Sequence, residues 1–399
     1  MARSDEERIG IFGAILALAV AAAAFAAGGE AGGAPPAALG FDIAPTVFFV
    51  RDGSALRQLL SLTVQNGGAA TSGTLTAAIA GRDLSFPLGQ IPAGRSTFSV
   101  AVPEVTKPVG AAFTLRAGRL TVRKEVGLKP QRKWTVDLFH HAHTDIGYTE
   151  LQTRVAANHA DYIDSAVDYC RQTDGYPDDA KFRWNIEVSW SLQQFLKTRP
   201  EARVRELVEL IKAGRIELSG LYLNQSDGFS HEELARSVDL AREFGKANGF
   251  EVVSAMNDDV NGFSWALPQI FRQAGIKYFA TGINETRSRA PLRRPCAFWW
   301  ESADGSRVLE WEGEHYLFAN YDLSLHEPLA TSAPKVGDYL AKLEARGDFP
   351  YDMIAFNISG WTTDNCPPGR GLSDRVKEWN EKYAYPKLRL AIWRDFFGP

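Results

Sequence analysis

Hydrophobic and polar positions follow three different patterns along the chain. Residues 9–27 are apolar or small without interruption by charge. Between residues 41 and 130, short runs such as LLSLTVQN and STFSVAVP alternate apolar and polar residues, and Gly, Pro and Asn-Gly turns separate them. Alternation with a period of two is typical of strands that bury one face. It predicts a small all-β sandwich over residues 41–130, which we interpret as an accessory domain because no chemical constellation falls within it.

From residue 131 to residue 399 the pattern changes to strands that alternate with amphipathic helices. Strand-like runs such as WTVDLFHH, FRWNIEV and RIELSG are separated by helical runs such as RVAANHADYIDSAVDYCRQ and EARVRELVELIKAG. This order predicts an α/β domain in which helices cover a parallel sheet, and the number of units favours a barrel over an open sheet. In such barrels the chemistry lies at the carboxyl ends of the strands.

The first 40 residues are predicted to be an export signal or anchor followed by a linker. The apolar stretch from Ile9 to Ala27 precedes the Gly/Pro-rich run GGEAGGAPPAALG, as in a secretory signal. The leader MARSDEER lacks the usual positive excess, so an uncleaved membrane anchor is the alternative. We therefore expect an exported protein, periplasmic or extracellular, with no stable membrane partner beyond such an anchor.

Composition narrows the partners and the kind of metal site. The formal net charge is -4, and Lys and Arg are scattered among acids, so nucleic acid is not an expected partner. The 3 cysteines show no CxxC spacing, which leaves His and carboxylate as the expected ligands of any metal. The 10 Trp residues offer faces for sugar rings, although most of them are expected to fill cores.

The segment FHHAHTDIGYT follows the strand TVDLF and is the first chemical candidate. His141, His143 and Asp145 alternate by two, so an extended backbone would project them to one side. Imidazole and carboxylate from one strand end could bind a divalent metal together with a third ligand. From the spacing alone, structural histidines held by hydrogen bonds are an equally good interpretation.

A second acidic strand end lies in the segment SAMNDDVNGFSW. Asp258 and Asp259 precede a Gly and a predicted helix, where they could cap the helix near Ser264. Together with His143 and Asp145, a carboxylate on this strand could instead act as both metal ligand and reactant.

These two segments carry a resemblance to glycoside hydrolase family 38, the α-mannosidases. HAHTDIGY is similar to the family's HxHxDxGW zinc motif, with Tyr148 where the family commonly has Trp. MNDDVNGFSWALPQIFRQAGIKYF resembles the family's nucleophile segment, and Gly262 and Ser264 follow Asp259 at the family's spacing, which places Asp258 one residue out. The resemblance covers Trp134 to about Phe397.

The resemblance implies the fold, the cofactor and the chemistry of the site. The fold would be an irregular (β/α)7-type barrel of the glycoside hydrolase/deacetylase kind. His143, Asp145 and Asp259 would bind Zn²⁺, and Asp259 would also be the nucleophile in the retaining hydrolysis of α-mannosidic bonds in mannose-containing oligosaccharides or glycans. Retention needs a second carboxyl group about 5 Å from the nucleophile.

The resemblance places the remaining site residues less firmly. Asp322 is the Asp nearest to the position of the family's acid/base, and Glu312 and Glu314 lie close to it in sequence. Tyr148 would stack on the sugar. Asp227 and Asp364 lie on predicted strand-end loops, where they would contact sugar hydroxyls or serve as ordinary loop acids.

The sequence departs from the family at its carboxyl end. The family's zinc site takes a further His from beyond the barrel, whereas this chain has no His after His326 and stops at LRLAIWRDFFGP. The chain is therefore either a fragment of a longer enzyme or a variant with an incomplete site, and the abrupt stop within a recognisable segment favours a fragment. Two other functions fit a barrel with His and Asp ligands: a zinc-dependent polysaccharide deacetylase, and a non-catalytic carbohydrate-binding protein.

Overall fold

The computed structural model describes residues 39–226, 228–286 and 288–398. The predicted signal or anchor at Ile9 to Ala27 and the predicted substrate ligand Asp227 lie outside the described residues. Within them, no helix combines the length and the apolar character that a membrane crossing requires.

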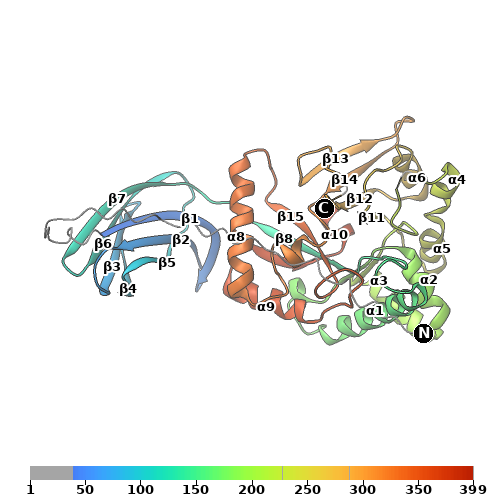
Figure 1. The fold of residues 1–399 in the computed structure, drawn as a ribbon, viewed down its shortest axis with the longest axis horizontal. Helices are drawn as coiled ribbons and strands as arrows, with labels where there is room; N and C mark the ends of the chain where they lie inside the picture. The colour runs from blue at the N-terminus through green and yellow to red at the C-terminus, as the bar shows by residue number, and fades with distance from the viewer. Residues whose placement is uncertain (1–38, 227, 287, 399) are drawn as a thin grey trace, which may run out of the picture.

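The amino-terminal part is built from two antiparallel sheets (Figure 1). The first has the order β1-β2-β5, and the second has the order β4-β3-β6-β7. The strands are β1 (Leu39–Asp52), β2 (Ala55–Asn66), β3 (Thr71–Ile79), β4 (Arg82–Ile91), β5 (Gly94–Pro103), β6 (Val109–Ala117) and β7 (Leu120–Leu128). The period-two pattern places alternate side chains, such as Leu60 and Leu62 from β2 and Phe113 and Leu115 from β6, in one shared core.

The rest of the described chain is a mixed α/β structure with three further sheets. Their orders are β15-β8-β16, β10-β9 and β11-β12-β14-β13, and every pairing except that of β13 with β14 is parallel. The strands are β8 (Thr135–His141), β9 (Trp184–Ile186), β10 (Ile216–Leu218), β11 (Ser254–Asp259), β12 (Tyr278–Ile283), β13 (Cys296–Glu301), β14 (Arg307–Glu312), β15 (Met353–Ser359) and β16 (Lys387–Leu390).

None of these sheets closes among the described residues, so the structure does not show the predicted (β/α)7 barrel. Strands β9 and β10 have only three residues each and pair with each other alone. Strands β8 and β9 belong to different sheets, and a side chain links them instead of backbone hydrogen bonds: the amide of Asn185 in β9 donates to the carbonyls of His140 and Ala391. The hydrogen-bonded sheet is therefore interrupted between β8 and β9.

Helices pack around the parallel strands (Figure 1). They are α1 (Gln152–Gln172), α2 (Ser189–Thr198), α3 (Glu201–Lys212), α4 (His231–Arg236), α5 (Asp239–Asn248), α6 (Leu267–Ala274), α7 (Phe318–Tyr321), α8 (Leu329–Arg346), α9 (Gly371–Lys382) and α10 (Trp393–Phe397). The carboxyl-terminal helix α10 packs against the central strand β8, because the rings of Phe139 and Trp393 stack at 3.7 Å. This contact supports the strand whose end carries the histidine motif.

The two antiparallel sheets meet the α/β part through β1. The backbone of Phe49 pairs with Tyr385, and the ring of Phe48 packs between Trp379 and Tyr383. Helix α8 lies beside this strand (Figure 1). The contact therefore lies away from the strand ends that carry the candidate site.

Candidate active site

Three side chains of the sequence motifs converge where β8 and β11 end. His143 Nε2 lies 3.7 Å from Asp145 Oδ1 and 3.7 Å from Asp259 Oδ2. These separations are too long for hydrogen bonds. They approach the spacing of about 3.4 Å between two ligands of one tetrahedral Zn²⁺ with bonds of about 2.0–2.1 Å. One imidazole nitrogen and two carboxylate oxygens are a donor set that fits zinc, with room for a further ligand.

Burial separates the roles of these three residues. The side chain of His143 is 2% exposed, that of Asp145 is 19% exposed and that of Asp259 is 33% exposed. His143 is thus the buried member of the group. The side chain of Asp259 is partly exposed, although its Oδ1 is buried.

Asp259 combines an unusual backbone with a low pKa. Its φ is +67°, in the left-handed region that residues other than glycine rarely adopt, and such residues concentrate at functional sites. The nearby imidazole of His143 lowers the pKa of Asp259, burial opposes this, and Asn284 and the nearby His315 lower it further. The carboxylate is therefore ionised, as both a metal ligand and a nucleophile require.

His143 is held from two sides. Its Nδ1 lies 2.8 Å from Glu187 Oε1, its backbone N–H donates to Ser359 Oγ at 2.8 Å, and its ring packs against Tyr316. Burial lowers the pKa of His143, but the negative charges of Glu187, Asp259 and Asp145 outweigh burial and raise it well above the usual value. In the metal-free protein His143 therefore carries a proton that a metal ion must displace.

Zinc affinity is consequently expected to fall as the pH is lowered. Below the pKa of His143, one proton is released for each ion bound, so the affinity should change about tenfold per pH unit. The same raised pKa stabilises the metal-free fold below about pH 6.5, the ordinary histidine pKa, and this stabilisation is lost as the pH rises through the pKa of His143. Competition with a chromophoric chelator between about pH 6 and pH 8 measures the affinity. An affinity independent of pH over this range would contradict the assignment of His143.

Asn365 holds the backbone of the metal-ligand residue Asp145. Its Oδ1 accepts from the Asp145 N–H at 3.0 Å and faces His159 Nε2 at 3.1 Å, and its Nδ2 donates to the Asp145 carbonyl at 3.0 Å. Asn365 itself has a left-handed φ of +39°. The loop after β15 thereby fixes the loop after β8.

Replacing Asn365 with Ala is expected to weaken zinc binding about 10–100-fold, because both backbone groups of Asp145 lose their partner. Asn380→Ala is the matched control. The amide of Asn380 brackets the backbone N–H and carbonyl of Leu388 in the same way, but Leu388 is not among the candidate ligands. Titration of the metal-free variants with zinc separates the two; equal affinities in both would show that Asn365 does not position the ligand.

Three other predicted site residues lie on loops or at a helix end: Tyr148, Asp364 and Asp322. The side chain of Tyr148 is 82% exposed on the loop after β8. Asp364 lies close enough to Asp145 for its charge to raise the pKa of that carboxyl, although burial of Asp145 is the larger cause. Asp322 follows α7 as its C-cap, and its charge acts on His315.

Both glutamates near Asp322 in sequence accept hydrogen bonds from other side chains. Glu312 Oε2 accepts from Thr281 Oγ1 at 3.0 Å, and the residue is buried. Glu314 Oε1 accepts from the Tyr339 hydroxyl at 2.7 Å. These bonds leave Asp322 as the more available carboxylate of the three.

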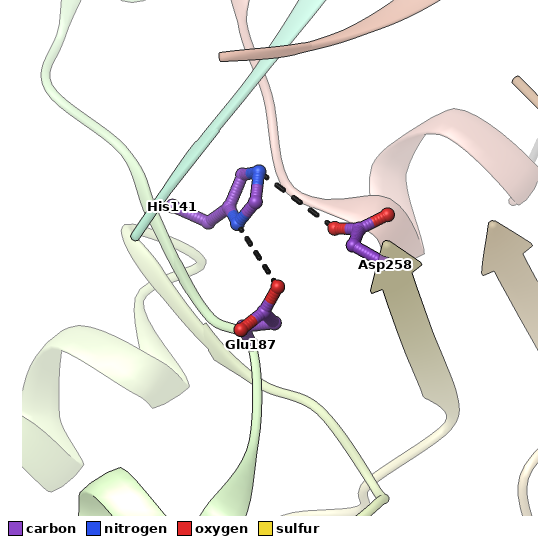
Figure 2. A group of neighbouring side chains, drawn as sticks. All are labelled: His141, Glu187 and Asp258. Atoms are coloured by element: carbon purple, nitrogen blue, oxygen red, sulfur yellow. Dashed lines mark ion pairs between the residues drawn. The ribbon is translucent and has the colours of Figure 1, made fainter. Parts of the chain in front are cut away.

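Two residues beside the candidate ligands, Glu187 and Asn365, were not singled out from the sequence. Glu187 belongs to a second group, with His141 and Asp258, that lies fully buried (Figure 2). This group joins the first one through the contact of Glu187 with His143. Glu187 directly follows β9, so an acid after a strand end was the signal that could have identified it. The sequence analysis chose Asp259 over Asp258. In the structure the two side chains point to different groups: Asp259 to His143 and Asp145, and Asp258 to His141 and Glu187.

The comparisons with known proteins agree with the motifs. The model of the glycosyl hydrolases family 38 N-terminal domain matches residues 133–398. Among solved structures, an alpha-mannosidase from Enterococcus faecalis V583 is similar with a TM-score of 0.54 and 18% identity over 66% of this chain. A family 38 protein from Enterococcus faecalis follows with a TM-score of 0.49 and 15% identity over 67% of this chain. No curated protein matches.

These matches cover most of this chain but a minor share of the solved structures. The matched region is 29% of the alpha-mannosidase and 27% of the second structure. At 18% identity the likeness shows the fold, and the family model supplies the assignment. The chain therefore belongs to glycosyl hydrolase family 38, whose N-terminal domain it contains over residues 133–398.

Proposed function

We propose that this chain carries the zinc-dependent catalytic site of a retaining glycoside hydrolase that acts on α-mannosides in glycans. The observation that supports it most is the convergence of His143, Asp145 and Asp259, with the Asp259 carboxylate ionised and its side chain partly exposed. The similar solved structure is an alpha-mannosidase. Since this chain spans 29% of that protein, the activity of the whole enzyme is part of the proposal.

The proposed chemistry gives each of these residues one role. Asp259 attacks the anomeric carbon, a bond forms between its carboxylate oxygen and that carbon, and the bond to the leaving oxygen breaks. Asp322 is proposed to give its proton to the leaving oxygen and then to take a proton from a water molecule, whose oxygen bonds to the anomeric carbon as the bond from that carbon to Asp259 breaks. Zn²⁺, when held by His143, Asp145 and Asp259, would act as a Lewis acid that binds the sugar hydroxyls and orients the ring.

The substrate contacts in this proposal come from the rim of the site. The exposed ring of Tyr148 is free to stack on a sugar face. Asp364 is proposed to accept hydrogen bonds from sugar hydroxyls, because it precedes Asn365, whose amide holds the Asp145 backbone, and its charge acts on the Asp145 carboxyl. Asp227 keeps the same proposed role on sequence grounds.

The direct test is hydrolysis of an aryl α-mannoside by the zinc-loaded chain, with the chelated chain as control. Proton NMR should show α-mannose as the first product, which then mutarotates, because retention proceeds through two displacements. β-Mannose as first product would contradict the retaining mechanism. Release of acetate from an acetylated glycan would favour a deacetylase, and glycan binding without turnover would favour a non-catalytic protein.

Export is proposed from the sequence of residues 1–40 alone. A fusion of this segment to a reporter that is active only outside the cytoplasm tests it. Reporter activity with removal of the segment would support a cleaved signal, activity with retention in the membrane would support an anchor, and no activity would contradict export.

A further inference from the structure

The buried group beside the metal residues is an alternating row of acids and imidazoles (Figure 2). His141 Nδ1 faces Glu187 Oε1 at 3.6 Å, and His141 Nε2 faces Asp258 Oδ2 at 3.7 Å. All three side chains are 0% exposed. Glu187 Oε1 also contacts His143 Nδ1 at 2.8 Å, so the row leads to the candidate metal ligand.

This row contains polar atoms that have no hydrogen-bond partner. Both nitrogens of His141, Glu187 Oε2 and Asp258 Oδ2 are buried without one. Buried polar groups left unpaired are strongly unfavourable, so these atoms must be satisfied either by one another or by a bound cation. A shift of less than about 1 Å would bring each facing pair into hydrogen-bond range.

The orientation of the His141 ring decides between these two possibilities. A metal ion binds one nitrogen of an imidazole, and its other ligands gather around that nitrogen. Here the two nitrogens face different carboxylates on opposite sides of the ring, as Figure 2 shows. This arrangement suits a hydrogen bond at each nitrogen.

We propose that Asp258, His141 and Glu187 form a buried relay of hydrogen bonds that positions the ring of His143 with Nε2 directed at the metal. The inference rests on the proposed metal site. These residues make no contact with substrate in it; they are positioning residues that act through His143. Their three side chains come from the ends of β8, β9 and β11, so the relay also ties together strands that no continuous ladder joins.

Donor and acceptor chemistry fixes the direction of every bond in the relay. His143 Nε2 must be bare to bind a metal, so its Nδ1–H donates to Glu187. The same oxygen, Glu187 Oε1, also faces His141 Nδ1, and an oxygen that accepts from His143 has no proton to give, so His141 must also donate through Nδ1. His141 Nε2 is then an acceptor, and its partner Asp258 must carry a proton on Oδ2.

The surroundings of Asp258 and Glu187 agree with this direction. The carboxyl groups of Asp258 and Glu187 are fully buried and lie within 4.8 Å of one another, and two carboxyl groups that share such a site do not readily ionise together. Asn357 Nδ2 donates to Asp258 Oδ1 at 3.1 Å, which leaves Oδ2 for His141.

The test compares two substitutions of Asp258. The amide of Asp258→Asn can still donate to His141 Nε2, so its zinc affinity should stay within about threefold of wild type, whereas Asp258→Ala should lose about 10–100-fold. Glu217→Gln, an amide in place of a buried carboxylate that contacts Ser254 and the Arg394 backbone, should leave the affinity unchanged. Equal affinity in wild type and Asp258→Ala would overturn the relay.

Metal stoichiometry separates the relay from a second cation site. Elemental analysis should give one zinc per chain; two per chain, with one lost in Asp258→Asn, would overturn the proposal. Because Asp258→Ala could fail to fold, ring-nitrogen NMR of labelled wild-type protein is the second measurement. It should show His141 protonated at Nδ1 and bare at Nε2, and the opposite tautomer would contradict the relay.

The NMR measurement also keeps the two proposals distinguishable. It is made on the metal-free chain and does not depend on turnover. If the wild type binds no zinc, the proposed function fails, and the His141 tautomer still supports or refutes the hydrogen bonds of the relay.

Discussion

Asp259→Asn is expected to lower kcat/KM for an aryl α-mannoside by at least about 10³-fold. The substitution removes the ionised oxygen that would attack the anomeric carbon and weakens one of the three metal ligands at once. Because two functions are lost, the zinc affinity and the rate must be measured together. If kcat/KM remains low at saturating zinc, the loss is due to the missing nucleophile and not to weaker metal binding.

The control for Asp259→Asn is Asp239→Asn in α5. Asp239 pairs with Arg242 on the surface, so its replacement changes the same chemical group without touching the site. Wild-type kinetics are expected for this control. An Asp259→Asn chain that hydrolyses the substrate at the wild-type rate with saturating zinc would mean that the nucleophile lies elsewhere.

Phe139→Ala is expected to lower the free energy of unfolding by about 3–5 kcal/mol. The ring of Phe139 is fully buried in β8 and stacks on Trp393 of α10 with an interplanar angle of 7°. Removal of the ring leaves a cavity between the central strand and the carboxyl-terminal helix. Urea unfolding monitored by Trp fluorescence and circular dichroism measures the loss.

Phe139→Leu is the matched control for the cavity. Leu refills much of the volume without the aromatic stack, so the loss should be about 1–2 kcal/mol. A loss below about 1 kcal/mol in Phe139→Ala would contradict the view that this contact holds α10 against β8.

The sequence predicted those features that depend on local pattern. Period-two alternation in LLSLTVQN corresponds to β2, whose alternate side chains are buried. The run HAHTDIGY, after a buried strand, predicted that His143 and Asp145 would share one strand end, and the register of Gly262 and Ser264 led to Asp259. The family drawn from these motifs is confirmed by the match over residues 133–398.

Features that depend on contacts between distant segments were beyond the sequence pattern. Glu187 lies 44 residues from His143, and Asn365 lies 220 residues from Asp145, so no local spacing connects them. The closed barrel was expected from the number of units, whereas closure depends on ladders between neighbouring strands, and β9 and β10 are too short to supply them. The choice between Asp258 and Asp259 was drawn from family register; the structure shows that adjacent acids can face separate groups.

The central claim, one zinc bound by His143, Asp145 and Asp259, is tested most directly by diffraction at the zinc absorption edge from crystals grown with zinc. The account predicts a single anomalous peak within about 2.0–2.2 Å of His143 Nε2 and of an oxygen from each carboxylate. A peak between His141 and Asp258, or no peak at His143 in a folded chain with zinc present, would contradict it.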